Sequence, residues 1–181
     1  MNRNRSPEIV LAFMVNIPWM APGKHWADDE TCSYMASALT IAMDISLNKL
    51  IVPSPSESLA GVHEIRPPSE CITARKALDI DGFQDVEPLS EMGRRLLRRR
   101  ERIWLALFVL DRGYVQHWLY EPRLHSTSVC LARGRSFTVP ITPIIEHCDN
   151  WHQSPMSDTW DGSLVASTML RRDLVCRYSP N

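Results

Sequence analysis

The segment from Ser90 to Gly113 (SEMGRRLLRRRERIWLALFVLDRG) constrains the fold more than any other part of the sequence. Ser90 is a favourable helix N-cap, Glu91 follows in the first turn, and Gly113 is typical of a helix end. After Arg102 the segment is apolar on every side, so we expect its second half to be buried all round. Apolar residues at helical spacing predict one continuous face, formed by Met92, Leu96, Ile103, Leu107 and Leu110 with Leu97, Trp104 and Phe108 beside it.

The first half of this helix carries six arginines within the nine residues from Arg94 to Arg102. A run of this kind is compatible with a nucleic-acid patch or a nuclear-import signal. A solvated helix face is the more common explanation, and the sequence favours it. The predicted basic face, opposite the apolar one, consists of Arg94, Arg95, Arg98, Arg99 and Arg102.

Two charges depart from this pattern, because Arg100 and Asp111 fall within the apolar arc. Their separation in sequence corresponds to roughly 16 Å along a helix axis, which is too far for them to pair with each other. A buried charge without a partner is strongly unfavourable. We therefore expect each of the two to be buried against its own partner from outside this helix.

Length and composition limit the classes of protein to which the chain belongs. Its 181 residues suffice for one ordinary domain, and 44% apolar with 23% charged residues is typical of a globular chain. The net charge of −1 argues against a free-standing nucleic-acid binder, which is usually strongly basic. Five scattered cysteines without a CxxC pair indicate neither a disulfide framework nor a zinc finger, and they fit a reducing compartment.

The remaining segments predict further helices and no strand, so the expected fold class is all-α, a helical bundle. Gly82 is expected to end the third of these helices, and two prolines require an extended backbone from Phe137 to Pro143. The apolar run Ile9–Val15 has no clear cleavage site after it and is too short to span a bilayer, so we expect neither a signal peptide nor a membrane segment. The further helices are expected over Ser6–Pro18, Asp28–Lys49, Ser69–Leu78 and Gly162–Asp173.

Two arrangements could carry chemistry. His147, Cys148, Asp149 and His152 bring metal-ligand side chains together, but no second ligand pair lies nearby in sequence. Any of the cysteines could in principle form a nucleophilic pair with a histidine, but no local signature of such a pair is present. We therefore predict no metal site and no enzyme.

Two motifs resemble the fungal-specific transcription factor domain, the helical middle region of fungal regulators that carry a zinc binuclear cluster. The first is the arginine run continued by Trp104–Arg112 (WLALFVLDR), and the second is Cys130–Pro140 (CLARGRSFTVP), similar to the family's glycine–arginine turn and extended proline segment. The helix from Tyr34 to Lys49 resembles the family's earlier alanine–leucine helix. The residues of this chain that match the family motifs are Arg100, Trp104, Phe108, Asp111, Arg112, Gly134 and Arg135.

The resemblance implies an all-α regulatory domain that acts in the nucleus, contacts other transcription-factor segments or regulatory proteins, and performs no catalysis. In that family zinc and DNA are bound by a six-cysteine cluster, which this sequence lacks. We therefore expect no cofactor in this chain and DNA contact only through such a cluster elsewhere. A homodimer is left open, and the alternative function is that of a helical scaffold or ligand-sensing protein with no DNA role.

The chain departs from the family pattern at two places. Residues Tyr114–Ser128 separate two motifs that normally adjoin, and we interpret them as an insertion outside the packed domain, either an in-frame unspliced intron or a surface loop. The chain also ends where the family's helical region continues, so the domain is expected to be partial. The predicted organisation is an N-terminal helix and linker over residues 1–27, the regulatory domain over 28–175, and a tail over 176–181.

Overall fold

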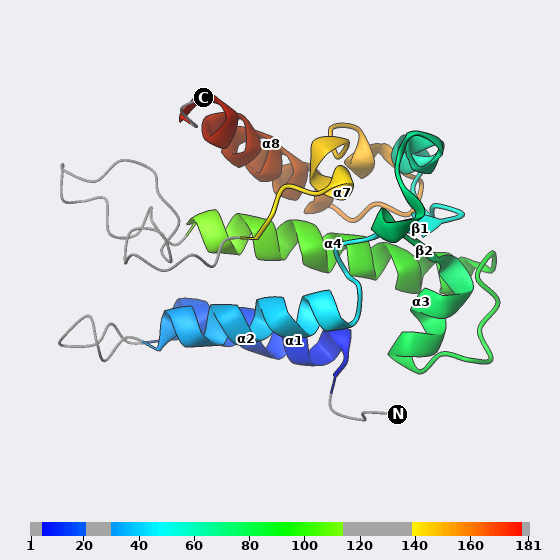
Figure 1. Cartoon of the computed structure of the whole chain (residues 1–181), viewed down its shortest axis with the longest axis horizontal. Helices are drawn as coiled ribbons and strands as arrows, with labels where there is room; N and C mark the ends of the chain where they lie inside the picture. The colour runs from blue at the N-terminus through cyan, green and yellow to red at the C-terminus, as the bar shows by residue number, and fades with distance from the viewer. Residues whose placement is uncertain (1–4, 21–29, 114–138, 179–181) are drawn as a thin grey trace.

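The computed structural model describes residues 5–20, 30–113 and 139–178, and these ranges are mostly helical (Figure 1). The helices are α1 (Pro7–Asn16), α2 (Thr31–Asp44), α3 (Ala74–Asp81), α4 (Glu91–Gly113), α7 (Pro143–Glu146) and α8 (Asp161–Tyr178). Two short strands, β1 (Leu50–Val52) and β2 (Cys71–Thr73), pair in parallel. Turns of 3-10 helix occupy Ile17–Trp19, Glu57–Leu59, Val62–Ile65, Pro68–Glu70 and Trp151–Gln153.

Helix α4 lies at the centre of the molecule, as Figure 1 shows. Helices α1 and α2 pack against each other on one side of α4, whereas α7 and α8 lie on its other side. Helix α3 packs against the first half of α4 beside the strand pair. Segments that are distant in the chain therefore meet on different faces of one helix.

The start of α4 is built as the sequence predicts. The Ser90 hydroxyl accepts a hydrogen bond from the backbone N–H of Gly93 at 3.0 Å, so Ser90 is the N-cap. Gly93 is needed because a Cβ there would lie 2.1 Å from the carbonyl oxygen of Glu87, which no neighbouring side-chain movement could relieve. The loop before α4 therefore packs directly onto its first turn.

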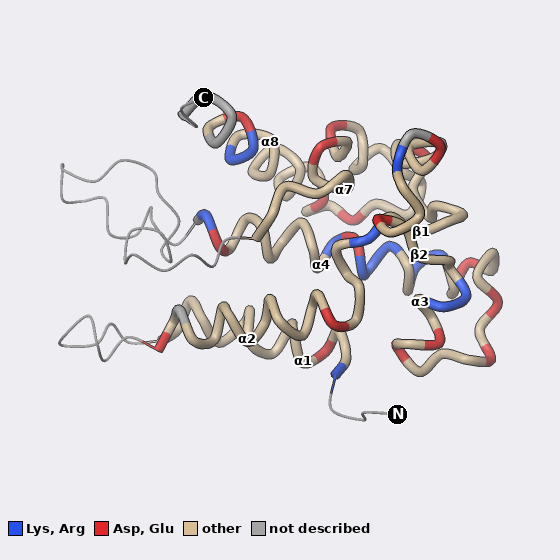
Figure 2. Tube along the Cα trace, in the orientation of Figure 1, with Lys and Arg blue, Asp and Glu red and all other residues tan. Residues whose placement is uncertain are grey.

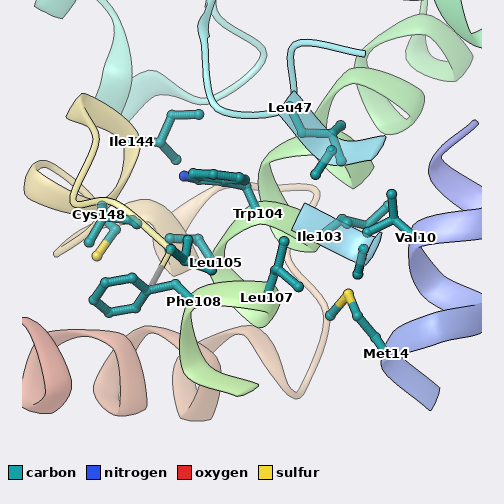
Figure 3. Packing of buried hydrophobic residues seen from close by; sticks show 14 of the residues in the cluster. Val10, Met14, Leu47, Ile103, Trp104, Leu105, Leu107, Phe108, Ile144 and Cys148 are labelled. Carbon is teal, nitrogen blue, oxygen red and sulfur yellow. The ribbon is translucent and has the colours of Figure 1, made fainter. Parts of the chain in front are cut away.

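The main core surrounds the second half of α4, and Figure 3 shows it from close by. Trp104, Leu105, Leu107 and Phe108 are completely buried as predicted, whereas Ala106, Val109 and Leu110 are only half-buried, so the second half of α4 is not buried on all sides. The Trp104 indole N–H also donates a hydrogen bond of 2.8 Å to the hydroxyl of Thr142, so its polar atom is satisfied. Helix α1, assigned from sequence to a separate N-terminal segment, contributes Val10 and Met14 to this same core, and the 3-10 turn after it contributes Ile17.

A second, smaller core lies between the strand pair, α3 and the start of α4. Its buried members are Ile51, Ile72, Ala74, Ala77, Leu78, Leu96 and Leu97. Together the two cores line most of the length of α4.

The strand pair corrects the expectation that the chain contains no strand. The helix predicted from Ser69 begins only at Ala74, because Cys71–Thr73 are extended and pair in register with Leu50–Val52. Thr73 then caps α3 through its hydroxyl, which accepts a hydrogen bond from the N–H of Lys76. Runs of three residues are too short to show the alternation by which strands are recognised.

Several helix boundaries agree with the sequence. Helix α1 ends before Pro18 as predicted, and Gly82 ends α3 in a left-handed conformation at φ +89°. Helix α8 begins at Asp161, one residue before its predicted start, and extends beyond the predicted end to Tyr178. Residues 139–142 are non-helical, in agreement with the predicted extended segment, whereas its last predicted residue, Pro143, already begins α7.

Some predictions concern residues outside the described ranges. These are Asp28, the predicted start of the second helix, the motif residues Gly134 and Arg135, and the insertion Tyr114–Ser128.

Replacing Trp104 by alanine tests the main core. We expect Trp104→Ala to lower the free energy of unfolding by about 3–5 kcal/mol, because a fully buried ring and its hydrogen bond to Thr142 are lost. The matched control is Trp160→Ala, since Trp160 is 77% exposed and its loss should change stability by no more than about 0.5 kcal/mol. Denaturant titration measures both, and equal midpoints for the two variants would contradict the prediction.

Candidate functional site

The arginine run of α4 is turned into the protein far more than the predicted basic face allows. Figure 2 marks these arginines in blue along the first half of α4. Arg94 and Arg95 are exposed as predicted, whereas Arg98 is only 1% exposed and Arg99 and Arg102 are half-buried. The prediction was wrong for Arg98 because the segments around Ser56 and Trp151 fold over this face of the helix. Met92, assigned to the apolar face, is 55% exposed.

Arg100 is buried against its own partners, as predicted. Its guanidinium donates to the carboxylate of Asp81 at the end of α3 and to the carbonyl oxygen of Ile45 at the end of α2. Burial raises the pKa of Asp81 to about 6, although Arg100 and Arg99 both favour the ionised carboxylate. Arg99 in turn contacts Glu8 of α1 at 2.5 Å, so neighbouring arginines connect α4 to three other helices.

Asp111 also has a partner outside α4, in agreement with the prediction. Its carboxylate accepts a hydrogen bond of 2.9 Å from the backbone N–H of Val139, and Arg112 donates one of 3.0 Å to the carbonyl oxygen of the same residue. The Arg112 guanidinium lies 3.8 Å from the ring centroid of Phe108, a cation–π contact. Asp111 and Arg112 thus bind the backbone N–H and the carbonyl oxygen of one buried residue, Val139.

Glu101 occupies the most enclosed part of the network. One carboxylate oxygen accepts hydrogen bonds from the hydroxyl of Ser56 at 2.5 Å and from the indole N–H of Trp151 at 2.7 Å. The other carboxylate oxygen is buried without a hydrogen-bond partner. Burial raises the pKa of Glu101 to about 7, even though these hydrogen bonds and the nearby Arg98 stabilise its charge. Glu101 therefore changes its protonation state near neutral pH.

Arg98 and Arg102 share a single carboxylate, that of Asp161 at the start of α8. Arg102 binds it with two hydrogen bonds of 2.7 and 2.8 Å, and Arg98 lies 3.3 Å from one of its oxygens. Burial by itself raises the pKa of Asp161, but the hydrogen bonds from Arg102 and from the N–H of Asp158 outweigh it and lower the pKa. Arg98 also stacks on Trp151, at 3.8 Å from its ring centroid.

A pocket of about 270 Å³ opens beside this shared carboxylate. Its wall on the α4 side is formed by three arginines, and its wall on the other side by the residues that precede α8. The lining residues are Arg95, Arg98, Arg102, Met156, Ser157, Asp158 and Thr159. The guanidinium groups of three arginines thus surround one opening, which gives the pocket a cationic wall.

The histidine and cysteine side chains form no comparable site in the described ranges. No group of three or more His, Cys, Asp or Glu side chains there is arranged to hold a metal ion. Cys148 is buried, and burial raises the pKa of its thiol to about 11, which opposes formation of a nucleophilic thiolate. None of the described helices combines the length and the hydropathy that a membrane crossing requires.

Sequence reasoning missed several members of this network. Glu101 could have been found, because it lies four residues after Leu97 and four before Leu105 and so shares their buried face. Ser56, Trp151 and Asp161 carried no such signal, since nothing local in the sequence shows which distant segment covers an arginine.

Comparison of the chain with models of protein families, with curated proteins and with solved structures finds no match. The resemblance to the fungal-specific transcription factor domain therefore stays a prediction from the motifs of the sequence.

Removing Arg100 tests the buried pair. We expect Arg100→Ala to lower the free energy of unfolding by about 3–5 kcal/mol, because Asp81 then keeps a buried carboxylate without its main partner. Arg94→Ala removes the same charge from an exposed position of α4 and should cost no more than about 0.5 kcal/mol. Urea unfolding of both variants decides the matter, and a small effect of Arg100→Ala would show that the pair is not buried.

Glu101→Gln tests the buried carboxylate through pH. A folded-state pKa raised from 4.5 to about 7 means that Glu101 stabilises the fold relative to glutamine at low pH and loses this contribution as the pH rises. The difference in unfolding free energy between wild type and Glu101→Gln should change by on the order of 3 kcal/mol between pH 4.5 and 7.5. Asp81 also has a raised pKa and gives a pH dependence of the same sign. Its contribution is present in both proteins and cancels when the unfolding free energy of the variant is subtracted from that of the wild type.

The control for this experiment is Glu91→Gln, which removes a carboxylate that is 70% exposed. Its unfolding free energy should follow that of the wild type across the same pH range. A pH-independent difference between wild type and Glu101→Gln would contradict the assignment of Glu101.

Proposed function

We propose that this chain is a regulatory and interaction module of a transcription regulator, a partial helical bundle of the fungal transcription factor type that acts in the nucleus through protein contacts and without catalysis. The observation that carries this proposal is the internal use of the arginine run. Arg98, Arg99, Arg100 and Arg102 all pair with carboxylates of other elements. The run thereby organises a scaffold, which is what a regulatory domain requires.

The same pairing argues against direct reading of DNA by this chain. Phosphate contacts require several cationic groups that are free to meet the backbone of the duplex, and base reading requires an element that enters a groove. Of the predicted basic face only Arg94 and Arg95 are exposed, which is too few for such contacts. DNA contact is therefore assigned to a cluster outside this chain, such as the zinc cluster of the family it resembles.

The alternative is a scaffold or ligand-sensing protein with no role in transcription. The pocket lined by arginines beside Asp161 supports this alternative, because a small-molecule sensor needs a concave site with polar groups. The two functions differ in what happens when the chain is brought to a promoter.

A tethering experiment separates them. The full chain is fused to an unrelated DNA-binding domain, and expression of a reporter gene with the matching sites is measured in a fungal host. We expect a change of reporter expression of at least several-fold relative to the DNA-binding domain alone, and loss of this change for the Trp104→Ala fusion, whose core is disrupted. The unfused chain should bind duplex DNA weakly and without sequence preference in a mobility-shift assay.

An unchanged reporter with a folded fusion protein would favour the alternative. Tight, sequence-selective binding of the unfused chain at physiological salt would contradict the proposal from the other side, because it would place DNA reading within these residues.

A further inference from the structure

The pocket between α4 and the segment before α8 has unused hydrogen-bond donors. Asp161 binds the Nε and Nη2 atoms of Arg102, and Glu91 binds the same two atoms of Arg95. Neither pairing uses Nη1, and no described residue accepts a hydrogen bond from the Nη1 atom of Arg95 or Arg102. Both side chains line the pocket, so two guanidinium groups are oriented by carboxylates and still carry free donors.

The pocket also has a rigid cationic wall. Arg98 lines it while being 1% exposed, and it is held by Ser56, by Ser157 and by the carbonyl oxygen of Trp151. Its Nε is buried and has no hydrogen-bond partner. An arginine fixed in this way contributes positive charge without the loss of side-chain entropy that a flexible surface arginine would incur on binding.

The carboxylates next to the arginines are already paired or can be neutral. Arg98 and Arg102 share Asp161, Arg95 is paired with Glu91, and the buried Glu101 accepts a proton near neutral pH. The start of α8 adjoins the pocket, and the amino end of a helix of this length favours negative charge. Asp158 on the rim works in the opposite direction.

We propose that this pocket binds an oxyanion, the phosphate or carboxylate group of a small molecule, through the guanidinium groups of Arg95 and Arg102 with Arg98 as the fixed cation behind them. Arginine is suited to this role because its planar donors match the geometry of both groups. The volume of about 270 Å³ accepts the anionic group together with a small part of the molecule that carries it. The inference does not depend on a role in transcription.

The experiment follows binding of inorganic phosphate to the full 181-residue chain by NMR, at constant ionic strength maintained with sodium chloride. Saturable shifts are expected at the backbone amides of Met156–Thr159. Arg95→Gln should weaken binding roughly fivefold, as for the loss of one exposed charge-assisted hydrogen bond. The matched control is Arg94→Gln, which removes the same charge from the neighbouring exposed position outside the pocket and should leave the affinity unchanged.

A variant with the opposite expectation completes the test. Asp158→Asn removes the carboxylate on the rim while keeping its oxygen, which accepts a hydrogen bond from the N–H of Thr159, so phosphate binding should become several-fold tighter. Parallel titrations with acetate and with N-acetyl-phosphoserine amide distinguish a carboxylate from a phosphate ligand and a free ion from a peptide-borne group. The proposal is overturned if phosphate does not saturate these amides, or if Arg94→Gln and Arg95→Gln weaken binding equally.

Discussion

Burial of the guanidinium groups of Arg98 and Arg100 is the constraint on which the arrangement around α4 depends. Removing an arginine side chain from water costs several kcal/mol, and the fold recovers this cost only where acceptors surround the charge. Arg100 therefore draws the ends of α2 and α3 to one point, and Arg98 does the same for Ser56, Trp151 and the start of α8. If one of these segments moved away, it would leave a cation unpaired.

These contacts specify the arrangement more than they add to stability. Apolar side chains of the same volume would fill the same space with no desolvation cost, so a buried pair is weak evidence for added stability. Three of the charged side chains of α4 instead require different hydrogen-bond partners. Arg100 requires a carboxylate and the carbonyl oxygen at the end of a helix. Arg102 requires both carboxylate oxygens of Asp161, and Asp111 requires a backbone N–H. A wrong docking of any one segment would leave such a group unsatisfied.

The sequence predicts the behaviour of α4 where the information is local. The capping by Ser90, the burial of Trp104 and Phe108, and the inward direction of Arg100 and Asp111 all follow from helical spacing. The inward direction of Arg98 does not, because its partners lie up to 63 residues away and cover a face that spacing alone assigns to solvent. The strand pair was missed for a similar reason, since three residues carry too little pattern and the pairing is between distant segments.

Glu101 and the pocket share the same two arginines, and this connects proton binding to anion binding. Arg98 and Arg102 stabilise the negative charge of Glu101. The negative charge of an anion bound to Arg95 and Arg102 offsets this effect, so it raises the pKa of Glu101 further above its ordinary value. By thermodynamic reciprocity, a protonated Glu101 then favours the bound anion by the same free energy. Because the pKa of Glu101 is about 7, both of its states are populated near neutral pH, where this coupling has its effect.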